Sequence, residues 1–273
     1  MQVPQRNLGQ NMLYILTLYA IYLKLYFHRL IEYRADTWIT LFTGLLTQAG
    51  SLAFVGILFH RIPQLAGWSF YELMFIYAFS VTGKALAEVF LNASFDMNGL
   101  IRRGMLDVFL VRPAGPLFQA IGISQEINGM GLAITGIMIL IFASFQLALT
   151  WTPGKVFYAI IAILSCMFVY FSVVFIVAIS TFWLIEIRSL IYPVAWLFEF
   201  TRYPLEIFHP VLRVILIYAI PYAMGSFYPA AYLLRPEQYS WALWAVPVFT
   251  SLLLWSAYQF WLQGLKRYSS VAG

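Results

Sequence analysis

The chain has 273 residues, of which 62% are hydrophobic, 19% aromatic and only 10% charged, and its mean hydropathy is +0.81. A soluble domain carries roughly a quarter charged residues and about half apolar ones, so this composition excludes a water-soluble globular protein and indicates a lipid-embedded one. A formal charge of +5 without a basic stripe is typical of a membrane orientation signal, and we expect no nucleic-acid binding.

The first apolar run, residues 12–23, is shorter than the roughly 20 residues that a transmembrane helix needs. Lys24, His28 and Arg29 follow it where a signal peptide would have small residues before a cleavage site. Tyrosines and leucines interleaved with charges are typical of an amphipathic helix at the membrane interface. We therefore expect no cleavage, and an interfacial helix over about residues 11–35.

Five later segments are long and apolar enough to cross a bilayer. Trp68 and Tyr71 open the second at a position suited to interfacial anchors. Gly129 and Gly136 allow close helix packing in the third, either within the chain or between two copies. The predicted spans are residues 37–59, 68–92, 116–148, 156–184 and 241–263.

The stretch between residues 187 and 234 allows two interpretations. Hydropathy favours a span over residues 211–234, although Pro221 and Pro229 interrupt it. The alternative is a short span at about 188–203 and then a hairpin that dips into the membrane without crossing it, because repeated prolines break a continuous helix. Both interpretations predict an all-α integral membrane protein with six transmembrane helices.

The basic residues of the loops predict the orientation of the chain. They gather in the N-terminal segment, in the 93–115 loop and in the C-terminal tail, and few remain on the opposite side. We therefore expect a multi-pass protein of the plasma (bacterial inner) membrane, with both termini and the 93–115 loop in the cytoplasm. The first set is Arg6, Lys24, Arg29, Arg34, Arg102, Arg103, Arg112, Lys266 and Arg267; the second is Arg61, Lys155 and Arg235.

No short motif gives the chain an enzymatic activity of its own. The phosphate loop is absent, since Gly83-Lys84 lies within a span and position 78 is alanine. No zinc-protease, serine-hydrolase or dinucleotide signature occurs. One cysteine, Cys166, and three scattered histidines predict no metal site. We expect no cofactor in this chain and no catalysis by it.

The charged residues within the predicted spans allow two interpretations. Lys84 and Glu88 lie four residues apart, and Glu199 and Arg202 three apart, so each pair can neutralise itself on one helix face. Ionisable residues inside a membrane also mark transport pathways. We favour pairs whose opposite charges neutralise each other. The intramembrane charged candidates, for which both interpretations stay open, are Glu72, Lys84, Glu88, Glu199 and Arg202.

The loop after the second span contains an amphipathic segment, residues 98–112. Asp96 or Asn98 can cap its start, and Pro113 ends it. The segment suits a helix resting on lipid headgroups, and equally a helix that docks in the groove of a cytoplasmic partner. Its residue types alone do not decide between these.

A resemblance decides in favour of docking. Residues 101–113, IRRGMLDVFLVRP, resemble the "IR.G.LD..L.RP" signature of one branch of the ABC-2-type (type II ABC exporter) permeases. Residues 67–73, GWSFYEL, resemble the opening of that branch's second span. Arg202-Tyr203-Pro204 resembles its "RYP" element, and Pro221 and Pro229 its later proline-bearing segment. The resemblance runs from about residue 30 to the end.

The resemblance implies an N-terminal elbow helix, six spans, a cytoplasmic coupling helix that seats in an ATPase subunit, and a re-entrant hairpin before the last span. Carried over, the elbow is about 11–35, the coupling helix about 98–112 and the hairpin about 205–234, marked by Tyr203, Pro204, Pro221 and Pro229. This favours the short fifth span at 188–203. Met105 stands where the branch often has glutamate.

The implied function is that of the permease subunit of an ATP-driven exporter, which moves an unidentified substrate out of the cytoplasm or inner leaflet. The implied partners are a separate ATPase that binds ATP and Mg²⁺, a second permease chain, identical or related, and lipid. The alternative is a membrane assembly or scaffold protein without transport activity. Arg102, Arg103 and Asp107 would set the docking register, and Leu106 and Phe109 would fill the partner's groove. The expected coupling residues are Arg102, Arg103, Gly104, Leu106, Asp107, Phe109, Arg112 and Pro113.

Overall fold

The computed structural model describes residues 8–126, 128–184 and 187–268, and every regular element within these residues is a helix. Five helical segments are long and apolar enough to cross a membrane, so the predicted all-α integral membrane class is confirmed. The elements are α1 (Leu8–Glu32), α2 (Arg34–Arg61), α3 (Phe70–Leu91), α4 (Ala93–Arg102), α5 (Leu106–Leu110), α6 (Pro116–Ile123), α7 (Asn128–Gln146), α8 (Pro153–Ile179), η1 (Ser180–Phe182), α9 (Arg188–Trp196), η2 (Leu197–Arg202), η3 (Leu205–Ile207), α10 (Pro210–Val214), η4 (Ile215–Ala219), α11 (Tyr222–Gly225), α12 (Phe227–Leu234) and α13 (Ala242–Arg267).

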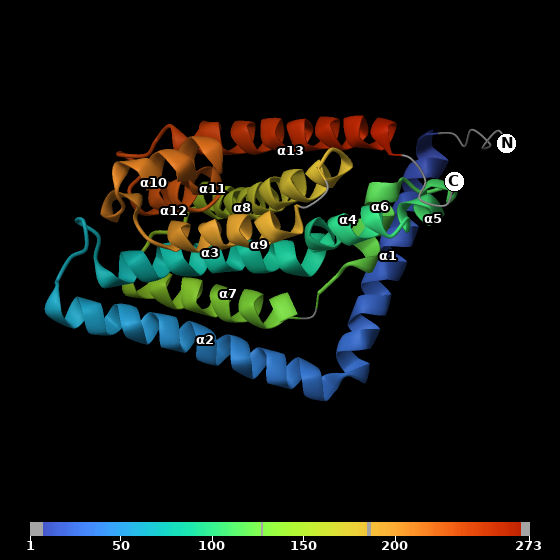
Figure 1. Cartoon of the computed structure of the whole chain (residues 1–273). Helices are drawn as coiled ribbons and strands as arrows, with labels where there is room; N and C mark the ends of the chain where they lie inside the picture. The colour runs from blue at the N-terminus through green and yellow to red at the C-terminus, as the bar shows by residue number, and fades with distance from the viewer. Residues whose placement is uncertain (1–7, 127, 185–186, 269–273) are drawn as a thin grey trace.

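The long helices run side by side, and the short elements gather at the two ends of the bundle (Figure 1). At one end, α5 lies with α4, α6 and the close of α13; we call this the α5 end. At the other, α10, α11 and α12 lie with the turn between α2 and α3; we call this the hairpin end. Both termini of the described chain are at the α5 end, since α1 lies there as well (Figure 1).

Helix α3 is the central helix of the bundle, and small residues let its neighbours approach closely. A Cβ atom at Gly83 would lie 2.3 Å from the Cys166 sulfur of α8. A Cβ at Gly129 would lie 2.8 Å from the Ala85 carbonyl oxygen, and one at Gly136 only 2.6 Å from the Thr82 hydroxyl. Gly129 and Gly136 of α7 therefore face α3 of the same chain, and Gly131 faces α2, so these glycines serve internal packing.

The range predicted as the third span, residues 116–148, contains two helices, α6 and α7, with a break at Ser124–Glu126. Helix α1 packs on this break. The Tyr26 hydroxyl donates to the Glu126 carbonyl at 3.2 Å, and Arg29 donates to the Gln125 carbonyl at 3.5 Å. A break exposes carbonyl groups that need donors, and α1 supplies them. Figure 1 shows α1 lying across the α5 end of the spanning helices.

The segment after α8 enters the bundle as α9 and continues directly into η2. With rises of 1.5 and 2.0 Å per residue, these two elements together extend roughly 25 Å, close to the thickness of a hydrocarbon core. Pro193 lies inside α9, where it removes one backbone donor. The length suits a short crossing from the α5 end to the hairpin end.

The next helices form a bent pair: Pro210–Ala219 and Tyr222–Leu234 meet at 71°. Such a bend belongs either to a broken span or to a re-entrant loop. The Tyr239 hydroxyl donates to the Glu206 carboxylate at 3.1 Å, so the chain leaves this segment beside the point where it entered. A segment whose two ends meet has not crossed the bundle. This contact favours the hairpin interpretation, in which α9 and η2 make the fifth of six passes and α13 the last.

Candidate functional site

Two groups of residues stand out for function: charged side chains along α3 inside the bundle, and the turn at the α5 end that carries the IRRGMLDVFLVRP sequence. Both lie on one continuous path. Helix α3 is followed by α4 after a single residue, Asn92, and α4 ends at Arg102, at the start of that turn. The range Phe70–Arg102 acts as one apolar helical segment. The turn at the α5 end is thus joined to the middle of the bundle by a nearly continuous helical path.

The first contact of α3 is at the hairpin end. Ser69 caps the helix and shares a capping box with Glu72. Arg235, directly after α12, donates to the Glu72 carboxylate at 2.9 Å and to the Gly67 carbonyl at 2.7 Å. Its guanidinium also lies 3.8 Å from the centre of the Trp68 ring. The start of α3 and the end of the hairpin are thus held together by a charged, partly buried contact.

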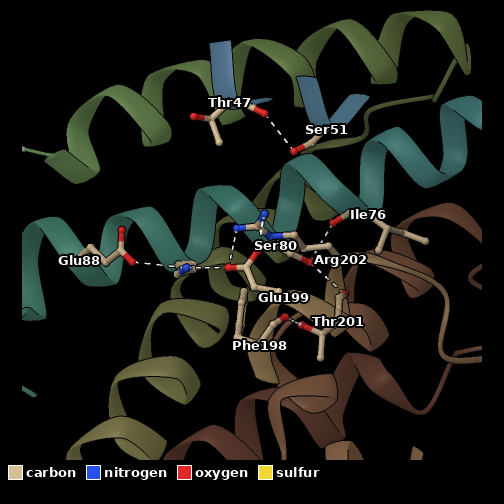
Figure 2. Close-up of polar contacts among 10 residues, drawn as sticks. Thr47, Ser51, Ile76, Ser80, Glu88, Phe198, Glu199, Thr201 and Arg202 are labelled. Atoms are coloured by element: carbon tan, nitrogen blue, oxygen red, sulfur yellow. Dashed lines mark hydrogen bonds and ion pairs between the residues drawn. The ribbon is translucent and has the colours of Figure 1, made fainter. Parts of the chain in front are cut away.

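The second contact of α3 is a four-residue charge cluster: Lys84, Glu88, Glu199 and Arg202. Lys84 Nζ lies 2.7 Å from the Glu199 carboxylate and 3.6 Å from that of Glu88. Arg202 lies 2.5 and 2.8 Å from the two Glu199 oxygens. Figure 2 shows Glu199 in the middle of this network, with Glu88 at one end and Arg202 at the other. Glu199 is shared by two cations and joins α3 to η2.

The cluster is neutral in sum and lies among aromatic rings. The Arg202 guanidinium is 5.4 Å from the centre of the Tyr77 ring, and Lys84 is 5.8 Å from that of Tyr170. Ser80 adds a hydrogen bond from α3 to the Thr201 carbonyl of η2, at 3.3 Å. Two cations balanced by two carboxylates in an apolar setting form a stable ionic link, because a lone charge there would be costly.

The sequence grouped these charges differently. Spacing predicted the pairs Lys84–Glu88 and Glu199–Arg202, and both contacts are present. Spacing could not predict that Lys84 lies closer to Glu199 than to Glu88, because that contact depends on how α3 packs against η2. Glu72, the fifth candidate, is at the hairpin end and bonds to Arg235 instead.

The turn at the α5 end is built around Gly104. The segment predicted as one coupling helix, residues 98–112, is divided between α4 and α5. Gly104 has a φ of +69°, in the left-handed region that favours glycine. This breaks the helix and redirects the chain, so that α5 has its own orientation. Asn98, still in α4, donates to the Thr181 hydroxyl at 2.6 Å and anchors α4 on η1.

The side chains that point outward from the turn are not those that the sequence analysis expected to fill the partner's groove. Leu106 and Phe109 are 0% and 4% exposed and pack into the core of this chain, so they position α5 rather than offer a free surface. Other large apolar side chains of the turn are exposed instead, and Val111 is 84% exposed. The exposed set is Met105, Val108, Leu110 and Val111, with Arg102, Arg103, Arg112 and Pro113 around it.

Two residues that sequence reasoning did not single out hold the turn in place. The Gln119 amide donates to the Phe109 carbonyl at 3.0 Å and to the Ala114 carbonyl at 2.6 Å, closing the connection between α5 and α6. Tyr268, after α13, lies beside Asp107; burial, and then this carboxylate, raise the pKa of Tyr268 above its ordinary value. Helical spacing could not predict either contact, because Gln119 bonds across the turn between two helices and Tyr268 lies far from Asp107 in the sequence.

The remaining candidates lie at the hairpin. Pro204, Pro221 and Pro229 are buried, and Tyr203 is half-buried. Tyr203 ends η2, and Pro221 lies in the bend of the hairpin, directly before α11. These residues shape the hairpin backbone rather than present reactive groups. Within the described residues, no group of three or more histidine, cysteine, aspartate or glutamate side chains could hold a metal ion.

Comparison with known proteins gives one match. A family model described as "ABC-2 family transporter protein" matches residues 45–272, which is most of the chain. The match covers α3, the charge cluster, the turn at the α5 end and the hairpin. No curated protein and no solved structure matches the chain.

Proposed function

This chain belongs to the ABC-2 transporter family and is thus a membrane-spanning permease subunit of an ABC transporter, and we propose that it exports its substrate with a separate ATPase docked at the α5 end. Membership of this family implies partnership with an ATPase subunit. The proposal adds where that subunit binds, how its movement is transmitted and in which direction the cargo moves.

The observation that carries the docking proposal is the outward face of the turn. Met105, Val108, Leu110 and Val111 are exposed on the turn at the α5 end, with Arg102, Arg103 and Arg112 beside them. Apolar side chains ringed by arginines are typical of a protein-binding surface, because the apolar groups fill a groove and the charges fix register. Buried Leu106 and Phe109, and the clamp from Gln119, make this surface rigid.

Transmission follows from the continuity of α3 and α4. Movement of the docked turn would tilt α4 and α3 together, as a rigid body. The charge cluster would carry that tilt to η2, and the Arg235–Glu72 contact would carry it to the hairpin. Two such chains around a central path, each above its own ATPase, would then alternate between inward-open and outward-open states.

The orientation in this proposal comes from the distribution of basic residues. Arg102, Arg103 and Arg112 lie at the α5 end, together with Lys266 and Arg267 at the close of α13. The hairpin end carries fewer, with Arg61 and Arg235 among them. By the positive-inside rule the α5 end faces the cytoplasm, where ATP is available to the partner. The membrane is then the plasma membrane, with both termini in the cytoplasm.

The test is purification of this chain from its native cells, in which an ATPase subunit bound to it would be recovered with it. We expect the two to purify together and to hydrolyse ATP. Val111→Asp should reduce the recovered ATPase at least tenfold, because a carboxylate would have to be buried in an apolar groove. Ile62→Asp, an exposed apolar residue at the opposite end, is the matched control and should leave recovery unchanged.

Equal recovery with Val111→Asp and Ile62→Asp would show that the ATPase does not use this surface. A complex with no nucleotide-hydrolysing subunit would favour the alternative, a membrane scaffold without transport activity.

A further inference from the structure

A cavity of about 480 Å³ opens at the α5 end; it shares Arg102, Arg103 and Met105 with the docking surface and extends from them to α6 and α9. It is lined by α4, by the residues at the end of α6 and by the start of α9. Three arginines line it, Arg102, Arg103 and Arg188, and Asp96 is the single carboxylate among the lining residues. Its size is within the range of pockets that bind small molecules.

The three arginines give the cavity an excess of positive charge. None of the ion pairs within residues 8–126, 128–184 and 187–268 involves Arg102, Arg103 or Arg188. Lys84 and Arg202, by contrast, are paired with carboxylates in the charge cluster. Three guanidinium groups that line one cavity against a single carboxylate, Asp96, leave an excess of positive charge that suits an anion with several acceptor oxygens, such as phosphate.

One wall of the cavity is apolar, while Asn98 and Ser124 add polar groups elsewhere in the lining. Phe95 of α4 and Tyr192 of α9 form a ring contact with centroids 5.8 Å apart on one wall, and Ile191 is buried beside them. Ile123 and Tyr192 are also exposed, so this wall reaches the outer surface of the bundle. A ligand with a polar head and an apolar body could enter sideways from the lipid.

We propose that this cavity binds the phosphate group of an amphiphile, such as a phospholipid headgroup, with the phosphate on the three arginines and the apolar part along Phe95, Ile123 and Tyr192. Basic pockets between spanning helices on the cytoplasmic side are suited to such headgroups. The placement on the inner side rests on the orientation in the proposed function. The bound molecule is either cargo at its point of entry or a resident lipid.

Arg188 separates this proposal from docking, because it lies on α9, outside the 98–112 segment. The test uses the full chain alone, purified in detergent, stripped of lipid and titrated with short-chain phosphatidylglycerol under native mass spectrometry. No ATPase is needed, so failure of the docking proposal leaves the binding result unaffected, and the reverse also holds.

We expect Arg188→Gln to raise the Kd for the phospholipid about tenfold, since a charge-assisted hydrogen bond is lost. Arg188→Lys keeps the charge and should bind with an intermediate Kd. Arg61→Gln, which removes one positive charge at the hairpin end, should leave the Kd unchanged. Thermal unfolding of each variant in detergent verifies that it is folded.

Two parallel titrations identify the ligand chemistry. A diacyl lipid without phosphate should bind at least tenfold more weakly than phosphatidylglycerol, and inorganic phosphate should compete only weakly because it lacks the apolar part. The proposal is overturned if Arg188→Gln binds like Arg61→Gln, if the phosphate-free lipid binds as tightly, or if inorganic phosphate binds while the phospholipid does not.

Discussion

Replacing Glu199 by glutamine tests whether the charge cluster holds α3 to η2. Glu199 is the shared carboxylate, 2.7 Å from Lys84 and 2.5 Å from Arg202. Its loss leaves Arg202 without its carboxylate partner and Lys84 with Glu88 alone, at 3.6 Å. Glutamine keeps the size and shape of the side chain, so the change removes charge and little else.

The magnitude follows from how far the cluster is buried. Breaking a fully buried ion pair costs about 3–5 kcal/mol, whereas an exposed pair contributes about 0–1 kcal/mol. The Glu199 side chain is 36% exposed and those of Lys84 and Arg202 are 17% exposed, which is between these limits. We expect Glu199→Gln to lower the free energy of unfolding by about 2 kcal/mol. That corresponds to a fall in Tm of roughly 4–8 °C.

Glu88→Gln is the matched control, since it is the same substitution in the same cluster. Glu88 has only its contact with Lys84, four residues away on the same helix, and such a pair contributes about 0.5 kcal/mol. The assay is thermal unfolding in detergent, followed by tryptophan fluorescence. Adding Arg202→Met to Glu199→Gln should cost less than the sum of the two single changes, because both act on one interaction. Equal falls in Tm for Glu199→Gln and Glu88→Gln would refute the shared role of Glu199.

Three further predictions concern the turn and the packing of α3. Gly104→Ala should cost about 1 kcal/mol of stability, because alanine is strained at a φ of +69°, and should lower ATPase recovery; unchanged recovery would mean that the turn is not needed for docking. Asp107→Arg should abolish coupled transport in proteoliposomes while the ATPase still co-purifies, and normal transport would count against a coupling role. Gly129→Leu should lower the Tm by at least 5 °C, because even a Cβ there would lie 2.8 Å from the Ala85 carbonyl oxygen. Gly154→Leu is the control, since a Cβ at Gly154 meets open space. Similar Tm values for the two variants would contradict the α3–α7 packing.

The fold class could be predicted because lipid imposes strong constraints on sequence. A span needs a long apolar run with every backbone group bonded internally, and such runs are visible without any knowledge of packing. Breaks are harder to locate. The interruption at Ser124–Glu126 was not predicted, because its carbonyl groups find donors on α1, about 100 residues earlier in the chain.

The candidate site shows the same division between local and distant contacts. Helical spacing predicts that Lys84 can reach Glu88, because both lie on one face of α3. It says nothing of Glu199, which is 115 residues from Lys84 and is brought close only by packing. The turn at the α5 end gives a second example. An amphipathic pattern identifies Leu106 and Phe109 as apolar but does not tell whether that face turns to the core or to a partner, and the bend at Gly104 turns it to the core.

The account depends most on the turn at the α5 end being a cytoplasmic surface that an ATPase covers. Cysteine labelling measures this directly, since Cys166 is buried and is the single cysteine of the chain. A Val111→Cys variant should react with a membrane-impermeant maleimide in inside-out vesicles, should not react in right-side-out cells, and should be protected when the ATPase is present. Labelling from the outside, or labelling at the same rate with and without the ATPase, would contradict the account.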